Sequence, residues 1–305
     1  MSIKTLIVGL GKVGMMYDYN NKKNNYTHAQ SINNNPYFDL LGGVDVSSKK
    51  REKFVTKFSK PAFNSIKSAY RDTKYDLIII SVPTIQTQKI YLEIIKKKIV
   101  PKAILFEKPV SNKSSISKKI FTYCERKKIK IFVNYNRRYD ISTRKIKEKF
   151  KKNFIGDVKH IEVIYHKGLF NSCSHYLNYL NFLFSDEKKL ISVKNKHQLK
   201  DDYLVDFHLK NKNFDINFVS KKNQRESIKI YGTLGKFVYY TEKDIIYFLK
   251  INKKKQQIQN NYSNGQKNVL KNIAQTFKNK AYPCSTSKDA IETLKYIEKI
   301  IRKLK

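Results

Sequence analysis

The chain has 305 residues, of which 40% are hydrophobic and 29% charged, a composition typical of a globular protein with a sizeable core. Its net charge of +38 would suit nucleic acid or an anionic membrane, but the lysines are scattered through every segment without a helix-turn-helix, zinc-finger or RNA-binding motif. The three cysteines are far apart and no apolar run is long enough to cross a bilayer, so we expect a cytoplasmic protein with no disulfide framework, metal site, nucleic-acid partner or membrane anchor.

The first stretch, 3–19, predicts a strand, a glycine turn and the start of a helix. The apolar run Leu6-Ile7-Val8 leads directly into the spacing G-x-G-x-x-G, formed by Gly9, Gly11 and Gly14. In a dinucleotide-binding turn the first glycine permits the tight turn, the second lets the pyrophosphate approach the backbone, and the third lets helix and strand pack closely. We therefore expect this turn, with Lys12 and Val13 inside it, to bind a dinucleotide; the alternative is an ordinary strand-to-helix turn.

The second predicted strand, 38–46, contains Asp45 near its end. An acidic residue at this place accepts hydrogen bonds from the adenosine ribose and disfavours a 2′-phosphate, so Asp45 favours NAD. NADP stays open because Ser47–Arg51 could hold a phosphate, and a helix-capping role for Asp45 is the alternative. The polar insert 20–26, expected as an exposed loop, accounts for the long spacing between the glycines and Asp45.

Helices and strands are predicted to alternate up to about residue 136. Strands are expected at 76–82, 102–106 and 130–134, with helices at 49–58, 66–70, 85–98 and from 111 or 112 to 127. This alternation predicts an α/β Rossmann domain, 1–136, with an open, doubly wound parallel sheet. Ser81, Pro83 and Thr84 are expected beside the nicotinamide ribose, and Glu107-Lys108-Pro109 follows the next strand.

The pattern changes from about residue 137. A helix is expected at 142–151, a half-exposed strand at 158–167 and a helix at 173–184, followed by a series of short strands from 190 to 250. The segment 256–266 is expected as a loop, and two helices at 267–278 and 287–303 end the chain. We predict a C-terminal α+β domain, 137–305, with a mostly antiparallel sheet that is available for self-association as a homodimer or homotetramer.

Four pieces of the sequence together resemble the Gfo/Idh/MocA family of NAD(P)-dependent oxidoreductases. They are GLGKVG at 9–14, FEKPVS at 106–111, VNYNRRYD at 133–140 and NSCSHYLN at 171–178. The resemblance implies a nicotinamide cofactor and a sugar, cyclitol or nucleotide-activated sugar as substrate, bound between the two domains. It also implies an enzyme that acts on CH-OH groups.

The resemblance further implies roles for individual residues. Lys108 corresponds to the lysine that holds the reacting hydroxyl, where a positive charge would stabilise a developing alkoxide. His175 corresponds to the acid/base, and imidazole titrates in the range that reversible proton transfer needs. Glu107 and Lys108 are expected at the cofactor, and Lys108, Tyr135, Arg137, Asn171 and His175 at the substrate; an arginine bridging the domains is the alternative for Arg137.

The chain departs from the family pattern at three positions. Asn171 and Asn178 stand where the family often carries Asp, and Thr87 stands where many members carry His. An amide cannot relay a proton as a carboxylate does, although helical spacing would place Asn171, His175 and Asn178 on one face. The alternative hypothesis is therefore a dinucleotide-binding sensor or partner subunit without turnover.

Overall fold

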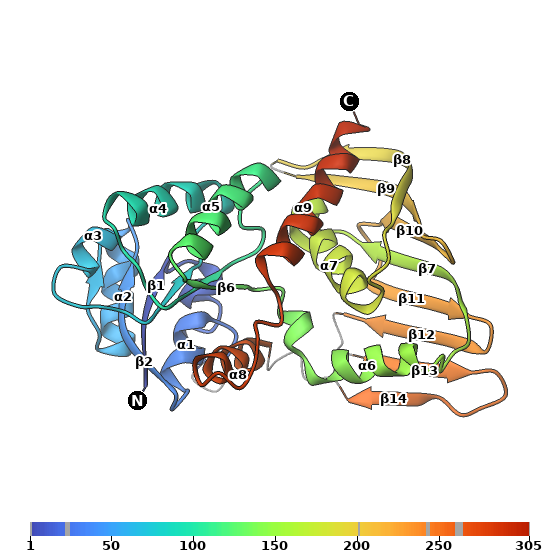
Figure 1. Ribbon diagram of the computed structural model, residues 1–305, viewed down its shortest axis with the longest axis horizontal. Helices are drawn as coiled ribbons and strands as arrows, with labels where there is room; N and C mark the ends of the chain where they lie inside the picture. The colour runs from blue at the N-terminus through green and yellow to red at the C-terminus, as the bar shows by residue number, and fades with distance from the viewer. Residues whose placement is uncertain (1, 22–24, 201, 242–244, 260–264, 305) are drawn as a thin grey trace. The chain divides into compact units, whose positions relative to one another are not determined.

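The computed structural model describes residues 2–21, 25–200, 202–241, 245–259 and 265–304 (Figure 1). The chain divides into two compact units, Met1–Tyr139 with Ser263–Ile291, and Asp140–Tyr262 with Glu292–Lys305. This division differs from the predicted one, 1–136 and 137–305, because α8 (Gly265–Phe277) packs its apolar side chains in the core of the first unit. The first unit is therefore completed by a segment far along the chain.

The first unit is built on a six-stranded parallel sheet in the order β3-β2-β1-β4-β5-β6. Its strands are β1 (Ile3–Val8), β2 (Phe38–Val44), β3 (Ala62–Phe63), β4 (Leu77–Ile80), β5 (Ala103–Phe106) and β6 (Lys130–Val133). The side chains of β4 and β5 are buried throughout, as an apolar run predicts for a sheet covered on both faces. The strand order reverses between β1 and β4, which makes the carboxyl ends of these strands the expected ligand position.

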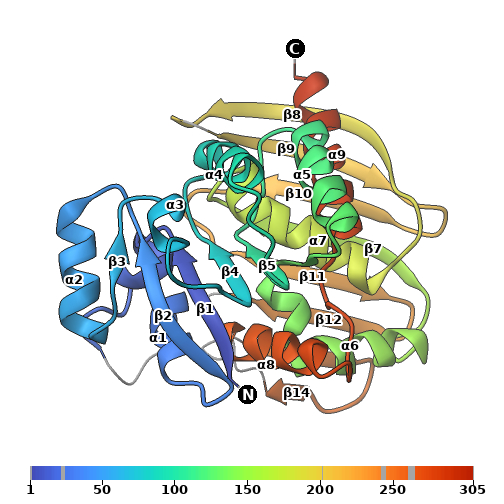
Figure 2. The same cartoon turned by 60° about the vertical axis from the view of Figure 1, so that its left-hand side comes forward.

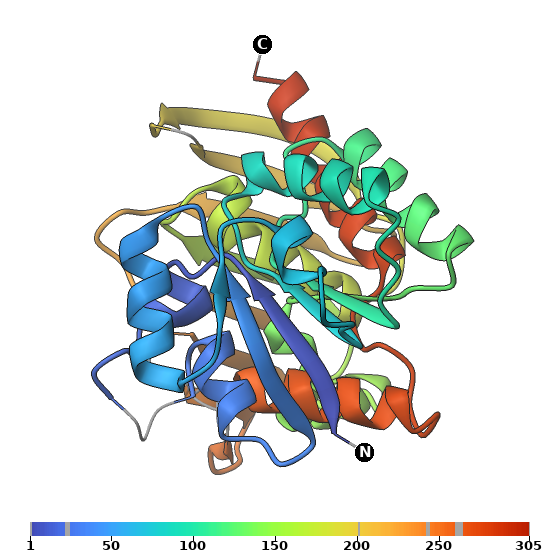
Figure 3. The same ribbon diagram turned by 90° about the vertical axis from the view of Figure 1, so that its left-hand side faces the viewer.

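Helices cover both faces of this sheet, as Figures 2 and 3 show. Side chains of α3 (Ile66–Ala69), α4 (Thr84–Lys96) and α5 (Ser114–Arg126) pack in the core on one face. On the other face α8 packs together with α1 (His28–Asn33) and α2 (Ser48–Phe58). In β1, Leu6 and Val8 face the first group and Ile3 and Ile7 the second, which is the two-residue alternation of a strand.

The second unit contains an eight-stranded sheet in the order β14-β13-β12-β11-β7-β10-β9-β8, in which only the β7–β10 pair is parallel. Its strands are β7 (Val158–Tyr165), β8 (Lys189–Gln198), β9 (Tyr203–Lys210), β10 (Asp215–Ser220), β11 (Ser227–Gly232), β12 (Gly235–Tyr240), β13 (Ile245–Lys250) and β14 (Gln256–Gln259). Apolar side chains of α6 (Ile141–Lys151), α7 (Ser174–Leu183) and the second half of α9 (Ser287–Arg302) pack in one core with those of the sheet. The predicted fold class is confirmed.

Two details differ from the sequence prediction. The helix after the glycine turn is only a five-residue π-helix, η1 (Lys12–Met16). The first α-helix, α1, begins later, after its N-cap residue Thr27. Residues 256–259 were expected in a loop but form edge strand β14, where pairing with β13 and packing of Ile258 are sufficient without an apolar run. The rest of that expected loop, 260–264, and residues 22–24 of the polar insert lie outside the described residues.

Within the described part of the chain, no helix is both long and apolar enough to span a membrane.

Candidate functional site

The glycine turn follows β1 directly, and each glycine has a different surrounding. Gly9 has φ of +98°, a conformation that side chains disfavour, and Gly14 packs so closely that a Cβ there would collide with the carbonyl oxygen of Gly9. At Gly11, by contrast, a Cβ would have no atom within 4 Å. The turn is therefore tight at Gly9 and Gly14 and open at Gly11, an arrangement that fits close approach of a ligand phosphate to the backbone.

The other residues expected at the cofactor lie around this turn. Ser81 follows β4 and its hydroxyl donates to the carbonyl oxygens of Gly9 at 2.7 Å and Val8 at 3.2 Å, so Ser81 fixes the turn. Lys12 is exposed and Val13 half-buried in η1. Pro83 is the exposed N-cap residue of α4, and Thr84, half-buried, is the first residue of that helix.

Asp45 lies just after β2 and is 8% exposed. Its Oδ2 accepts the Leu10 N–H at 2.9 Å and its Oδ1 accepts the Ser47 N–H at 3.0 Å, so the carboxylate connects the end of β2 to the glycine turn. Ser47, rather than Asp45, is the N-cap residue of α2. Lys50 Nζ is 3.4 Å from Oδ2, and the Arg51 guanidinium donates to the backbone carbonyl of Asp45 at 2.8 Å.

Glu107 follows β5 and is the centre of a polar cluster within the first unit. His28 Nε2 lies 2.7 Å from Glu107 Oε1, and the Asn134 side-chain amide donates to the same oxygen at 2.6 Å. Asn134 also reaches Gln266 Oε1 at 3.4 Å. Burial alone would raise the pKa of Glu107, but hydrogen bonding to His28 and Asn134 and the charges of His28 and Lys108 hold that pKa below its ordinary value.

Lys108 is half-buried and its backbone N–H donates to Glu107 Oε2 at 3.3 Å; the Lys108–Pro109 peptide bond is cis. Because Lys108 follows β5, it belongs to the carboxyl edge of the parallel sheet, as does the glycine turn after β1. Glu107, with its lowered pKa and its hydrogen bonds to His28 and Asn134, thus immediately precedes Lys108, the lysine predicted to hold the reacting hydroxyl. His28, Asn134 and Gln266 were not predicted as part of this site.

The stretch after β6 is more buried than expected. Tyr135 is 2% exposed and packs in the apolar core of the first unit, which leaves its ring little surface for a substrate. Arg137 is half-buried in a 3-10 turn, η2 (Asn136–Tyr139). The neighbouring Arg138 is buried and forms an ion pair with partly exposed Asp289 near the start of α9, at 2.8 Å and within the same unit.

In the second unit, the residues around His175 lie on two kinds of helix. Asn171 is exposed in a π-helical turn, η3 (Leu169–Cys173), whereas His175 is half-buried in the first turn of α7. Asn178 is 1% exposed and its amide donates to Thr293 at 3.0 Å. The helix type changes between Asn171 and His175, since η3 ends at Cys173 and α7 begins at Ser174. That the three residues share one face stays a prediction.

Asp202 holds the turn that precedes His175. Its carboxylate accepts the backbone N–H of Phe170 at 3.0 Å and of Asn171 at 3.2 Å, and a Cβ at Gly168 would collide with it. Burial raises the pKa of Asp202, although these backbone donors oppose the shift. Sequence reasoning missed Asp202 because it is about thirty residues from the turn that it holds.

A second buried carboxylate, Glu226, lies beneath the same helix. It is 3% exposed, accepts the Tyr176 hydroxyl at 2.7 Å and the His166 backbone N–H at 3.1 Å, and lies 3.6 Å from His166 Nδ1. Tyr176 also contacts Thr241 at 3.0 Å. Burial alone would raise the pKa of Glu226, but the hydrogen bonds from Tyr176, His166 and Ser172 and the charge of His166 outweigh burial and lower it.

We expect Glu226→Gln to lower the free energy of unfolding at pH 7 by about 2 kcal/mol, since hydrogen bonds to a charged group are lost. A lowered carboxyl pKa contributes stability above its unfolded value of about 4.3, and this contribution disappears as pH falls through the folded value. The difference between wild type and Glu226→Gln, measured by urea unfolding from pH 7 down to about pH 3, should therefore stay constant to about pH 5 and shrink below it. The control is Glu162→Gln, which breaks a partly exposed pair with Lys229 and should cost under about 1 kcal/mol. A loss of stability that is the same at every pH would contradict the prediction.

Comparison with known proteins adds to this geometry. Residues 3–135 match the model of a family described as "Oxidoreductase family, NAD-binding Rossmann fold". No curated protein sequence matches the chain significantly. Among solved structures, the chain is similar over 99% of its length to a dehydrogenase from Clostridium difficile, with a TM-score of 0.80, 17% identity and 99% of that chain covered.

Two of the similar structures were solved with a nucleotide-linked ligand in addition to a dinucleotide. A 3-ketoreductase from Actinomadura kijaniata, solved with TDP-benzene and NADP, has a TM-score of 0.81 and 10% identity, with 99% of this chain and 98% of that chain covered. The WlbA dehydrogenase from Bordetella pertussis, solved with NADH and UDP-GlcNAcA, has a TM-score of 0.78 and 13% identity, with 99% and 95% covered. At these identities the likeness shows a common fold.

Proposed function

We propose, from the match of residues 3–135 to the model of the Gfo/Idh/MocA family of NAD-binding oxidoreductases, that the protein transfers hydride between a nicotinamide cofactor and a hydroxyl-bearing or keto carbon of a sugar, a cyclitol or a nucleotide-activated sugar. The observation that carries the proposal is that the glycine turn after β1 and Lys108 after β5 both lie at the carboxyl edge of one parallel sheet, with only β4 between the two strands. Ligands of open parallel sheets gather at this edge.

The residues of the first unit fit a dinucleotide. Free space at Gly11 lets a pyrophosphate approach the backbone, and Asp45 lies beside the turn with its carboxylate directed to Leu10 N–H. When bound, the nicotinamide accepts or returns a hydride. The Lys108 ammonium then holds the reacting oxygen and stabilises negative charge on it, and His175 exchanges the hydroxyl proton.

The substrate class is supported by the two similar proteins solved with nucleotide-linked ligands. The decisive experiment incubates the purified protein with NAD or NADP and a panel of sugars, cyclitols and nucleotide-activated sugars, and follows the nicotinamide absorbance. Reduction of the cofactor with one class of substrate supports the proposal. Self-association through the sheet of the second unit, as a homodimer or homotetramer, stays a prediction that light scattering can test.

We expect NADH to bind at least about tenfold more tightly than NADPH, a difference of about 1.4 kcal/mol. The reason is that the Asp45 carboxylate would repel a 2′-phosphate and accept ribose hydroxyls. Fluorescence titration of the two cofactors measures the ratio, and Asp45→Ser should reduce it by weakening NADH binding. If NADPH binds more tightly to the wild type, Lys50 and Arg51 determine the choice instead.

A second candidate function is a dinucleotide-binding sensor or partner subunit without turnover. The amides of Asn171 and Asn178 favour it, because neither can act as the carboxylate that the family often carries near its histidine, and Asn178 is committed to Thr293. This candidate predicts NADH binding with no activity over the whole panel. It also predicts that Lys108→Ala changes nothing in the activity assay.

A further inference from the structure

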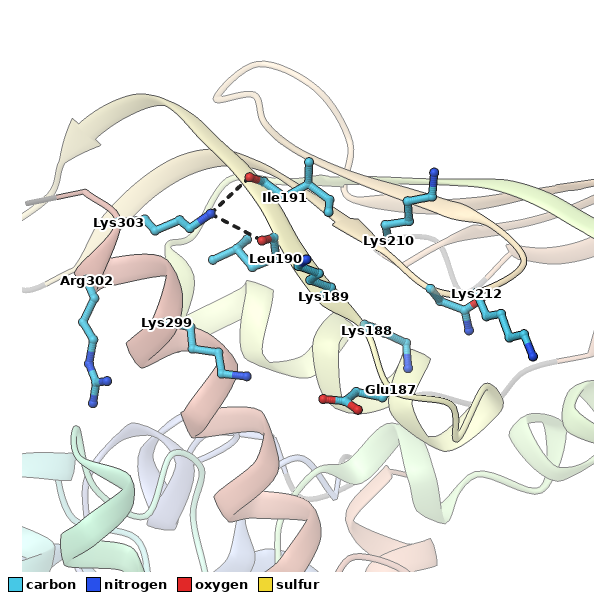
Figure 4. A pocket seen from close by; sticks show the side chains of 11 residues that line it. Glu187, Lys188, Lys189, Leu190, Ile191, Lys210, Lys212, Lys299, Arg302 and Lys303 are labelled. Atoms are coloured by element: carbon cyan, nitrogen blue, oxygen red, sulfur yellow. Dashed lines mark hydrogen bonds between the residues drawn. The ribbon is translucent and has the colours of Figure 1, made fainter.

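A pocket of about 870 Å³ opens in the second unit, away from every residue assigned a role above (Figure 4). Its wall comes from three places in the sequence: the chain entering β8, the turn between β9 and β10, and the last turns of α9. Seven of its eleven lining residues are Lys or Arg and only Glu187 is acidic, whereas the whole chain has 63 Lys and Arg in 305 residues. The pocket is thus about threefold richer in cations than the chain.

Two of these cations are held by hydrogen bonds to backbone carbonyl groups, buried Lys188 and exposed Lys303. Lys188 is 3% exposed, and its ammonium donates to the carbonyl oxygens of Phe184 at 2.7 Å and Asp186 at 3.0 Å. Burial lowers its pKa to about 8, against the opposing charges of Glu292 and Asp186. The Lys303 ammonium donates to the carbonyl oxygen of Ile191 at 3.1 Å, as Figure 4 shows. Hydrogen bonds of this kind fix the position of a positive charge but do not neutralise it.

The remaining five cations are exposed, and within the described residues none of them forms an ion pair. They are Lys189, Lys210, Lys212, Lys299 and Arg302. Figure 4 shows Lys299 and Arg302 extending from α9, while Lys210 and Lys212 extend from the opposite side of the pocket. Positive charges that line one pocket without a paired carboxylate repel one another. A bound anion would relieve this repulsion.

We propose that this pocket binds a small molecule with two or more phosphate groups, such as a nucleoside diphosphate or an inorganic polyphosphate. The cations line a pocket formed by three separate segments, which suits a compact ligand. They come from opposite walls, so a single anionic group could contact only some of them. Arg302 offers the planar fork that matches a phosphate in a bidentate contact, and the lysines add point charges.

Isothermal titration of the full-length protein with inorganic tripolyphosphate tests the proposal. We expect one site per chain, with a Kd that rises at least about tenfold in Lys212→Glu/Lys299→Glu because attraction becomes repulsion on both walls. The control is Lys118→Glu/Lys119→Glu, two exposed lysines of α5 that change the net charge by the same amount. The control should change the Kd less than about twofold.

Equal weakening in both double variants would overturn the proposal, because it would reveal general attraction to a basic protein. Absence of tripolyphosphate binding would also overturn it. Lys212→Gln/Lys299→Gln should give an intermediate Kd, which keeps the test available if charge reversal impairs folding. Titration with ADP and with orthophosphate distinguishes the source: tighter binding of ADP identifies a nucleotide, tighter binding of tripolyphosphate identifies the phosphate chain, and tightest binding of orthophosphate overturns the proposal.

Discussion

Replacing Lys108 by methionine is expected to lower kcat by about 10³-fold, the effect typical of losing a group that stabilises charge or transfers a proton in the transition state. Methionine keeps most of the side-chain length, so packing beside Glu107 and Pro109 should be retained. The affinity for NADH should change less than about twofold, because backbone groups of the glycine turn supply most of the expected phosphate contacts. Steady-state kinetics on the best substrate of the panel and NADH titration measure the two effects.

The matched control is Lys118→Met on the exposed side of α5, which removes the same charge without touching the site. It should leave both kcat and NADH affinity unchanged. Comparable turnover in Lys108→Met and wild type would mean that another group holds the reacting oxygen. A loss of NADH binding in Lys108→Met that equals its loss of turnover would instead assign Lys108 to the cofactor.

The predictions that agreed with the structure rest on local signals. The apolar runs that became β1, β4 and β5 each consist of a few consecutive residues. The alternation of these strands with helices along the chain was sufficient to predict that the first sheet is parallel. The position of α8 could not be predicted in this way, because its apolar face carries no information about which unit it completes.

The polar contacts of the candidate site depend on the fold instead. Glu107 is bonded to His28 and Asn134, which are 79 and 27 residues away, and only the sheet order brings them together. Glu226 meets Tyr176 across 50 residues for the same reason. Asn178 is buried and bonded to Thr293, 115 residues away, a contact that helical spacing does not reveal.

Gly14→Ala should destabilise the protein by about 3 kcal/mol, at the upper end of the usual cost of overpacking, because the new Cβ meets the carbonyl oxygen of Gly9. That oxygen also accepts the Ser81 hydroxyl, and Gly9 itself occupies a backbone conformation that few residues adopt, so the turn cannot easily relax. Urea unfolding should therefore show a lower midpoint, and NADH binding should be lost with the shape of the turn.

Gly11→Ala separates the two roles of the glycines. No protein atom lies within 4 Å of the new Cβ and the backbone there has φ of −79°, so stability should stay within about 0.5 kcal/mol of wild type. NADH affinity should nevertheless fall at least about tenfold, because the methyl group occupies the space through which the pyrophosphate reaches the backbone. If Gly11→Ala binds NADH like the wild type while Gly14→Ala unfolds, the glycines serve only the packing of the turn and the cofactor binds elsewhere.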